Sequence, residues 1–265
     1  MESNDTSRRE LLDACYFNDL SKAQGAIATG RLTDEDLDEG LYFATLLARA
    51  DIVAALFEAG ARLTIRAADA LPGRHHHQDP RIVRQFLDRG LDPNIRLSNG
   101  DPLMILNPAC AAVLLSAGAD PNLRGPRGIP PLARAIASAR NPDTSLLELY
   151  LAHGATLEPD LLFSAVAPRV QQSEPMTRFL LERGVDPNGT SDDDYWGTPL
   201  HCAVACGKVS IVKMLLEAGA DPTVVAGRRK FGNKSPLEVA EKVPHLESRE
   251  AIVALLQSYA CRDPQ

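Results

Sequence analysis

The stretch TPLHCAVACGKVSIVKMLLEAGADP, residues 198–222, decides the fold. Thr198 followed by Pro199 is typical of a helix start, with the threonine as cap and the proline at the first helical position. Gly219 supplies the left-handed residue that ends a helix, and Pro222 keeps the helix from resuming. Between them lie apolar residues at the spacing of one helical face: Ile211, Val212, Leu215 and Leu216.

The end of this stretch recurs along the whole chain. An apolar pair, two variable residues and a glycine repeat with glycines at positions 30, 60, 90, 118, 154, 184 and 219, and an eighth copy without glycine ends near 259. A period in this range is typical of a solenoid of stacked units. We therefore expect one repeat domain over residues 8–260, between a disordered N-terminal tail (1–7) and a short C-terminal tail (261–265).

The paired motifs Thr-Pro-Leu-His-x-Ala and Leu-Leu-x-x-Gly-Ala-Asp-Pro resemble the ankyrin repeat. The match is nearly complete over residues 198–222, and the other repeats match mainly in their second half. The resemblance implies an all-α ankyrin-repeat solenoid of about eight stacked helix pairs, with short hairpin fingers at several junctions. It also implies that His201 bonds to neighbouring backbone and stiffens the stack. The residues expected to start the first helix match Thr-Pro-Leu-His-x-Ala less closely in other repeats, at residues 101–104, 130–133 and 235–238.

Composition narrows the class of protein. The 28 cationic and 35 acidic side chains give a net charge of −7, which disfavours direct binding of nucleic acid. No apolar run is long enough to span a membrane, and the first residues contain no apolar signal segment. Five cysteines in a chain of this length do not indicate a disulfide framework. We expect a monomeric protein of the cytoplasm, the nucleus or both.

The junctions between repeats are of two kinds. After Gly30, Gly60 and Gly154 the chain leads directly toward the next helix. After the glycines at 90, 118, 184 and 219 an Asp-Pro linker leads into a finger, and the fingers lengthen toward the C-terminus. We therefore expect an open groove over the repeats from about residue 90 onward, with the first two repeats acting as a cap.

The finger tips and the ends of the first helices are the candidate binding surface. Trp, Tyr and Arg are the commonest anchors of interfaces, and the single Trp of the chain falls on the third finger. Alternatively, Trp196 folds onto its own repeat, and the oppositely charged third and fourth fingers pair with each other. The resemblance places Ala205 and Cys206 in the groove. The candidates are Trp196, Tyr195, Asp193, Asp194, Arg229, Phe231, Arg124, Arg127, Ala205 and Cys206.

Patterns that would indicate other chemistry are weak. His75, His76 and His77 could bind a metal, but three consecutive loop residues seldom converge on one ion, and an exposed polar loop is the simpler interpretation. Cys202 and Cys206 lack a second ligand pair for zinc. His201 and Cys202 are adjacent on a helix and therefore point to different faces, which disfavours a nucleophilic pair. We expect Thr33 to cap a helix whose first turn contains the acidic run at residues 34–39, which complements the helix dipole; alternatively, the run recruits a basic partner. We expect no catalytic residue, cofactor or metal.

These observations favour a non-enzymatic module for protein–protein interaction, a rigid scaffold that binds a partner protein in its concave groove. Two alternatives remain open at this point. One is an ankyrin-type regulatory protein, such as a transcription co-regulator. The other is an enzyme or a small-molecule binder built on the same scaffold. The sequence does not identify the partner.

Overall fold

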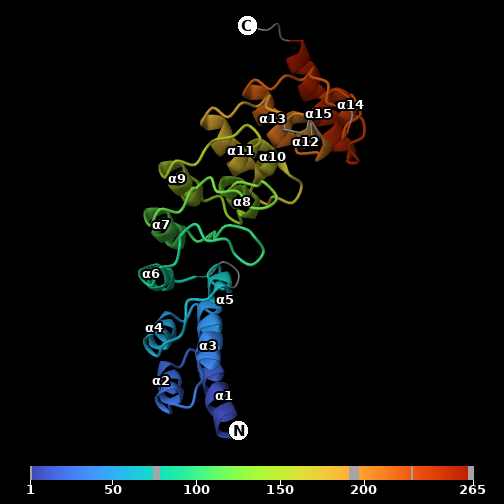
Figure 1. Cartoon of the computed structure of the whole chain (residues 1–265). Coiled ribbons are helices and arrows are strands. Elements are labelled where there is room, and N and C mark those ends of the chain that lie inside the picture. Colours follow the sequence, from blue (N-terminus) through green and yellow to red (C-terminus); the bar gives the residue numbers. More distant parts are fainter. Residues whose placement is uncertain (1, 74–77, 191–196, 228, 262–265) are drawn as a thin grey trace. The chain divides into compact units, whose positions relative to one another are not determined.

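A computed structural model describes residues 2–73, 78–190, 197–227 and 229–261, with side chains from residue 5 onward (Figure 1). The described chain is helical. Its 15 helices are α1 (Glu2–Phe17), α2 (Leu20–Ala28), α3 (Asp34–Leu46), α4 (Ala50–Glu58), α5 (Ile65–Asp69), α6 (Pro80–Asp88), α7 (Pro108–Ser116), α8 (Pro131–Ser138), α9 (Ser145–Ala152), α10 (Leu161–Val166), α11 (Ser173–Glu182), α12 (Pro199–Ala205), α13 (Val209–Glu217), α14 (Pro236–Ala240) and α15 (Leu246–Ala260).

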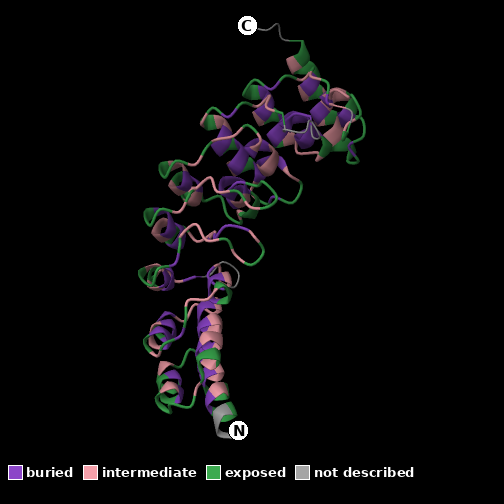
Figure 2. Cartoon of the chain, in the orientation of Figure 1, coloured by how far each residue is buried: buried purple, intermediate pink, exposed green. Residues whose placement is uncertain are grey.

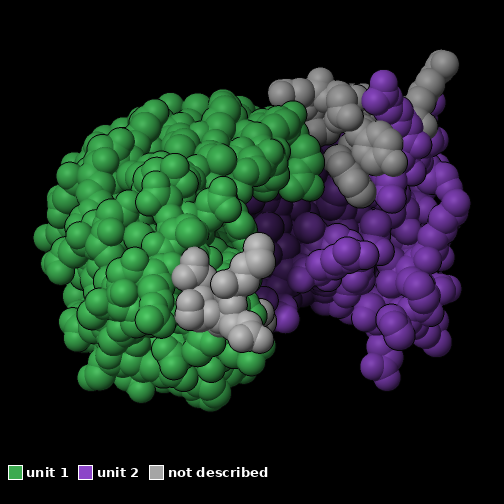
Figure 3. Space-filling model, turned by 60° about the horizontal axis from the view of Figure 1, so that its bottom comes forward, with its two compact units in different colours: residues 1–131, 152–154 green, residues 132–151, 155–265 purple. Residues whose placement is uncertain are grey.

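The chain divides into two compact units, and each is described by itself (Figure 3). Unit 1 comprises residues 1–131 and 152–154, and unit 2 comprises residues 132–151 and 155–265. Within unit 1, α1, α3 and α5 form one row and α2, α4 and α6 form the other. Within unit 2 the rows are α10, α12, α14 and α11, α13, α15. In each unit the buried faces of the two rows point toward each other (Figure 2).

The recurring glycines end helices as the sequence predicts. All seven adopt positive φ, between +64° and +100°. In six of the seven, the residue after the glycine donates its N–H back to a carbonyl in the last helical turn, as Ala220 does to Leu215 at 2.9 Å. These bonds satisfy carbonyl groups that the helix ends leave unpaired. Local chemistry therefore sets the boundaries of the repeats.

The fourth repeat departs from the expected pattern. Residues 101–104 were expected to open a first helix, but residues 101–107 form none; Arg96 and Pro102 instead form an antiparallel bridge. The reason is length, because only 28 residues separate Gly90 from Gly118. Leu103 and Ile105 of the extended segment are buried, so it fills the place of the missing helix in the core.

Helix α1 begins at Glu2, inside the segment expected as a disordered tail. Ser7 is buried, and its hydroxyl oxygen accepts a hydrogen bond from Thr29 at 3.4 Å. Arg8 donates to the Glu39 carboxylate at 2.8 Å and lies 3.4 Å from the Asp36 carboxylate. Contacts with α2 and α3 therefore hold this part of α1 in place.

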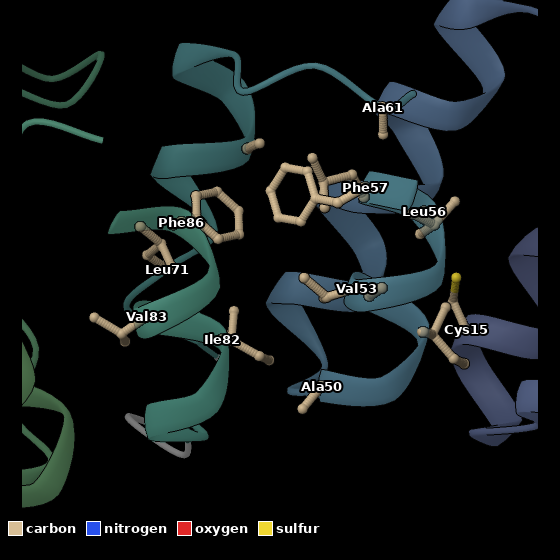
Figure 4. Packing of buried hydrophobic residues seen from close by; sticks show 14 of the residues in the cluster. Cys15, Ala50, Val53, Leu56, Phe57, Ala61, Leu71, Ile82, Val83 and Phe86 are labelled. Carbon is tan, nitrogen blue, oxygen red and sulfur yellow. The ribbon is translucent and has the colours of Figure 1, made fainter. Parts of the chain in front are cut away.

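The core of unit 1 is aliphatic with one aromatic pair. The rings of Phe57 on α4 and Phe86 on α6 meet edge to face, with centroids 5.1 Å apart (Figure 4). Phe86 is fully buried, and Leu56 and Ile82 extend the same layer. Each helix pair thus completes its core only against the next pair, as expected of a repeat array.

Asparagines of the Asp-Pro-Asn turns link successive repeats. Asn94 Nδ2 donates to the carbonyl of Gly118 at 3.0 Å, and its Oδ1 accepts from the backbone N–H of Asp120 at 2.7 Å. We call this series of bonds the asparagine ladder. Two further copies, each joining Nδ2 to a glycine carbonyl 2.9 Å away, run from Asn122 to Gly154 and from Asn188 to Gly219.

Two helical glycines offer a matched test of packing in unit 1. A methyl group at exposed Gly25 would meet nothing within 4 Å, whereas one at buried Gly40 would lie 2.8 Å from Leu11 Cδ2. We expect Gly25→Ala to raise the free energy of unfolding by about 1 kcal/mol through helix propensity. Gly40→Ala should lower it by about 1–3 kcal/mol through overpacking. Urea unfolding followed by circular dichroism measures both, and equal shifts would contradict the packing described here.

Candidate functional site

The structure does not describe every predicted site residue. Asp193, Asp194, Tyr195 and Trp196 lie outside the described residues, as do the three histidines at 75–77. The interpretations of the acidic third finger and of the histidine loop therefore stay predictions. Of the remaining candidates, Arg124 and Arg127 belong to unit 1, and Ala205, Cys206, Arg229 and Phe231 belong to unit 2.

In unit 1 the candidates Arg124 and Arg127 are exposed on the second finger. The Arg124 guanidinium donates to the carbonyl of Gly128 at 2.6 Å, four residues along its own finger. Arg96 makes the same bond to Gly100 at 3.0 Å and also donates to the carbonyl of Arg124 at 3.1 Å. Arg124 thus helps to shape its finger, whereas Arg127 lies exposed near the tip.

In unit 2 three of the predicted residues meet at one pocket. Exposed Ala205, at the end of α12, lies beside Arg229 and Phe231 of the fourth finger around a cavity of about 380 Å³. Val239 of α14 and Val243 complete its apolar lining. We call this cavity the α12–α14 pocket. Cys206 follows Ala205 in the chain, is half-buried and is not among the lining residues.

His201 contacts two residues that line this pocket, the ring of Phe231 and the backbone of Lys234. It is fully buried, and its Nδ1 accepts from the backbone N–H of Thr198 at 3.2 Å. Its Nε2 lies 3.0 Å from the carbonyl oxygen of Lys234, an acceptor, so Nε2 carries the proton and donates. Phe231 stacks on the imidazole with ring centroids 5.6 Å apart. The predicted bonding of His201 to neighbouring backbone is confirmed, and its role in stiffening the stack stays a prediction.

The rim of the pocket carries cations that the sequence prediction did not select. Besides Arg229, the lining includes Lys230, Lys234 and Lys242. Residues 228–242 contain five cationic and two acidic side chains, within a chain of net charge −7. That local excess was visible in the sequence. Its convergence was not, because Lys242 lies beyond α14 and only the folded hairpin places it beside Lys234.

The backbone of the fourth finger explains this convergence. The N–H of Ala226 donates to the carbonyl of Lys234 at 3.0 Å, and Asn233 donates to Gly227 at 3.3 Å, closing a hairpin. The Lys234 carbonyl therefore receives bonds from both Ala226 and His201. Directly afterwards Ser235 caps α14: its Oγ accepts from the N–H of Glu238 at 3.4 Å, and its own N–H donates to the Glu238 carboxylate at 2.8 Å. The lysine backbone is anchored while its side chain lines the pocket.

Cys202 and Cys206 of unit 2 are not arranged as nucleophiles. Burial raises the pKa of the Cys202 thiol to about 12, and burial also raises that of Cys206. Both nitrogens of His201 are engaged with Thr198 and Lys234, so the ring is not placed to take a proton from Cys202. Over the described residues no group of three or more His, Cys, Asp or Glu side chains is arranged to hold a metal ion.

Cysteine labelling tests this picture directly. Burial raises the pKa of Cys15 to about 12 and that of Cys110 to about 11, whereas Cys261 is exposed. At pH 8 we expect iodoacetamide to alkylate Cys261 at least about 100-fold faster than Cys15, Cys110 or Cys202, because the thiolate is the reactive form. Peptide mass spectrometry reads each site. In concentrated guanidinium chloride the rates should converge, and rapid native labelling of Cys202 would contradict its burial.

The acidic run of α3 serves the fold of unit 1. Thr33 Oγ1 accepts from the N–H of Asp36 at 3.2 Å, and the Asp36 carboxylate accepts from the N–H of Thr33 at 2.9 Å. The predicted capping role is therefore confirmed. The Asp38 carboxylate accepts from the Arg62 guanidinium at 2.6 Å.

No helix of the described chain is both long enough and apolar enough to cross a bilayer.

Stacked antiparallel helix pairs, ended by left-handed glycines and joined by finger turns, define a helical-repeat solenoid. A family model described as "Ankyrin repeats (many copies)" matches residues 162–216. The human ASB11 ankyrin repeat domain superposes with a TM-score of 0.65 at 20% identity, over 85% of this chain and 98% of that one. The ankyrin repeat domain of Bcl-3 superposes with a TM-score of 0.53 at 22% identity, over 74% of this chain and 82% of that one. Residues 162–216 therefore match the ankyrin repeat family, and the chain has the fold of an ankyrin repeat solenoid.

Other relatives match over shorter segments. An ankyrin repeat domain from Acinetobacter baumannii superposes with a TM-score of 0.54 at 24% identity, over 68% of this chain and 92% of that one. Mouse 2-5A-dependent ribonuclease is 47% identical over 73 residues, which is 27% of this chain and 8% of that protein. The human transient receptor potential cation channel subfamily A member 1 is 46% identical over 48 residues, which is 18% of this chain and 4% of that protein. The matched segments thus span less than a tenth of these two proteins.

Proposed function

We propose that this chain is a non-enzymatic interaction module that binds a partner protein on the surface formed by its fingers and the ends of its first helices. The ankyrin repeat fold implies a module for protein–protein interaction. The observation that carries the finer proposal is the α12–α14 pocket, because it joins Ala205 at the end of a first helix to Arg229 and Phe231 on a finger. A partner seated there contacts both parts of the predicted surface at once.

The mechanism is rigid display. His201 ties α12 to the backbone of the next repeat, and its stacking on Phe231 orients that ring before any partner arrives. A surface that is already ordered loses little conformational entropy on binding, so more of the contact energy appears as affinity. Residence in the cytoplasm or the nucleus is part of the proposal, because five cysteines in a chain of this length do not indicate a disulfide framework.

Affinity capture followed by mass spectrometry tests this function. The bait is the whole chain as wild type, as Trp196→Ala/Arg229→Ala, and as the control Arg178→Ala/Lys213→Ala, whose residues are exposed on α11 and α13. We expect the first variant to lose partners that the wild type and the control both retain, because buried aromatic and arginine anchors dominate interfaces. Unchanged capture by a variant with wild-type thermal unfolding would overturn the finger surface as the binding site.

A further inference from the structure

We propose that the α12–α14 pocket binds an acidic segment of a partner protein, in which carboxylate side chains flank one apolar side chain. This inference rests on the proposed function and specifies the chemistry of the partner. The pocket offers two kinds of surface, an apolar lining and a cationic rim, and the proposed segment matches both.

The apolar part of the pocket suits one side chain. It is formed by Ala205, Phe231, Val239 and Val243, which come from the end of α12, the fourth finger, α14 and the residues after it. Val239 and Val243 are buried, and Phe231 is half-buried and held against His201. A leucine-sized side chain placed there would lose most of its contact with water, a contribution of about 1.5–3 kcal/mol for full burial.

The cationic rim comes from two separate segments. Arg229, Lys230 and Lys234 belong to the fourth finger, and Lys242 follows α14. Lys230 also acts electrostatically on both Cys202 and Cys206, which places its charge near α12. Cations from the fourth finger and from the residues after α14 therefore line the same cavity as the apolar side chains. A ligand with carboxylates on both sides of an apolar group fits this arrangement by charge complementarity.

Two of these cations are close to each other. Lys234 and Lys242 both line the pocket, and Lys234 lowers the pKa of Lys242. The pKa of Glu238 is lowered by its hydrogen bonds with Ser235, which cap α14, and also by the charge of Lys234. A carboxylate from a partner placed between the two lysines would relieve the repulsion, which favours the bound state electrostatically.

A protein segment fits better than a small inorganic anion. An anion alone would use the rim and leave Ala205 and Phe231 uncovered, whereas a peptide covers both parts. A cavity of about 380 Å³ accommodates a few side chains and is within the range of pockets that bind ligands. The net charge of −7 disfavours acidic partners over the rest of the chain, so the attraction is local to this pocket.

Fluorescence anisotropy with three labelled peptides tests the chemistry. The probe carries Glu-Glu-Leu-Glu-Glu, one control replaces every glutamate by glutamine, and the other replaces the leucine by serine. We expect the probe to bind the whole wild-type chain at least tenfold more tightly than either control, and more weakly as salt rises. Equal binding of the glutamine peptide would overturn the role of charge. Equal binding of the serine peptide, or displacement of the probe by inorganic phosphate alone, would overturn the role of the apolar lining.

Matched variants locate the site. Lys234→Glu/Lys242→Glu reverses two charges of the rim, and Arg178→Glu/Lys213→Glu makes the same change in net charge on the exposed faces of α11 and α13. We expect the rim variant to weaken probe binding at least tenfold and the control at most threefold. Lys234→Gln/Lys242→Gln gives a milder loss without new repulsion, should charge reversal disturb folding. Equal loss in the rim variant and the control would overturn the assignment.

Failure of this inference is distinguishable from failure of the proposed function. Partners captured by the wild type, lost by Trp196→Ala/Arg229→Ala and retained by Lys234→Glu/Lys242→Glu would uphold the finger surface and reject the acidic segment. Loss of the same partners in both variants, with probe binding weakened in the rim variant, supports both. Retention of all partners by both variants rejects both.

Discussion

Phe86→Ala is expected to lower the free energy of unfolding by about 3–5 kcal/mol, the largest effect anticipated for a single substitution in unit 1. The ring is fully buried and lies edge to face against Phe57, with centroids 5.1 Å apart. Truncation removes the aromatic contact and leaves a cavity between α4 and α6 that the aliphatic neighbours cannot close without moving backbone. Urea unfolding followed by circular dichroism measures the change.

The matched control for Phe86 is Phe17→Ala. Phe17, near the end of α1, is 73% exposed, so its truncation creates no cavity and should change the free energy of unfolding by less than about 1 kcal/mol. Comparable losses in the two variants would mean that the aromatic layer between α4 and α6 is not part of the core.

Leu216→Ala is expected to cost about 2–5 kcal/mol in unit 2. Leu216 lies on α13 and is 2% exposed, whereas the next residue, Glu217, is exposed. Because each repeat is stabilised mainly by its neighbours, the loss should be greatest in α11, α13 and α15. Hydrogen exchange read by mass spectrometry resolves these helices separately.

Glu217→Ala tests the register of the same helix. It changes the neighbouring position with almost no loss of packing, and we expect its exchange rates to match those of the wild type. A larger effect from Glu217→Ala than from Leu216→Ala would show that the buried face of α13 is assigned to the wrong residues.

The sequence predicts the fold well wherever local chemistry decides it. A glycine after a helical apolar stripe both marks and forms the helix end, so Gly219 and its counterparts could be placed from the pattern alone. The same holds for Thr33 and Asp36, whose capping bonds involve only residues three positions apart. His201 was predicted through the family resemblance, since its partner at Lys234 lies 33 residues away.

Prediction from the sequence was least complete where the structure depends on contacts between repeats. Residues 101–104 have the sequence of a first-helix start, but their repeat is too short to contain that helix. An extended segment buries Ile105 instead. The sequence predicts the Asp-Pro linkers after the helix ends, but no role for the asparagines that follow them at positions 94, 122 and 188. Their bonds to glycines in later repeats depend on how repeats stack, which spacing alone does not reveal.

The candidate site was predicted in part for the same reason. Selection of residues by interface propensity found Arg229 and Phe231, and family position found Ala205. It passed over Lys234 and Lys242, because lysine is a poor anchor statistically and because their proximity arises only when the fourth finger folds back. Propensity selects residues one at a time, whereas a pocket is defined by the side chains that meet in it.

The asparagine ladder bears on how such a chain gains or loses repeats. Its two partners, Asn at the start of one finger and Gly at the end of the following repeat, recur in both Asn94–Gly118 and Asn122–Gly154. A duplicated repeat inserted within this segment would therefore meet a complementary partner at each new junction. After Gly30 and Gly60 the equivalent turns contain no asparagine, so duplication there would create a junction without that bond. The ladder marks the segment where the gene can vary in repeat number at the lowest structural cost.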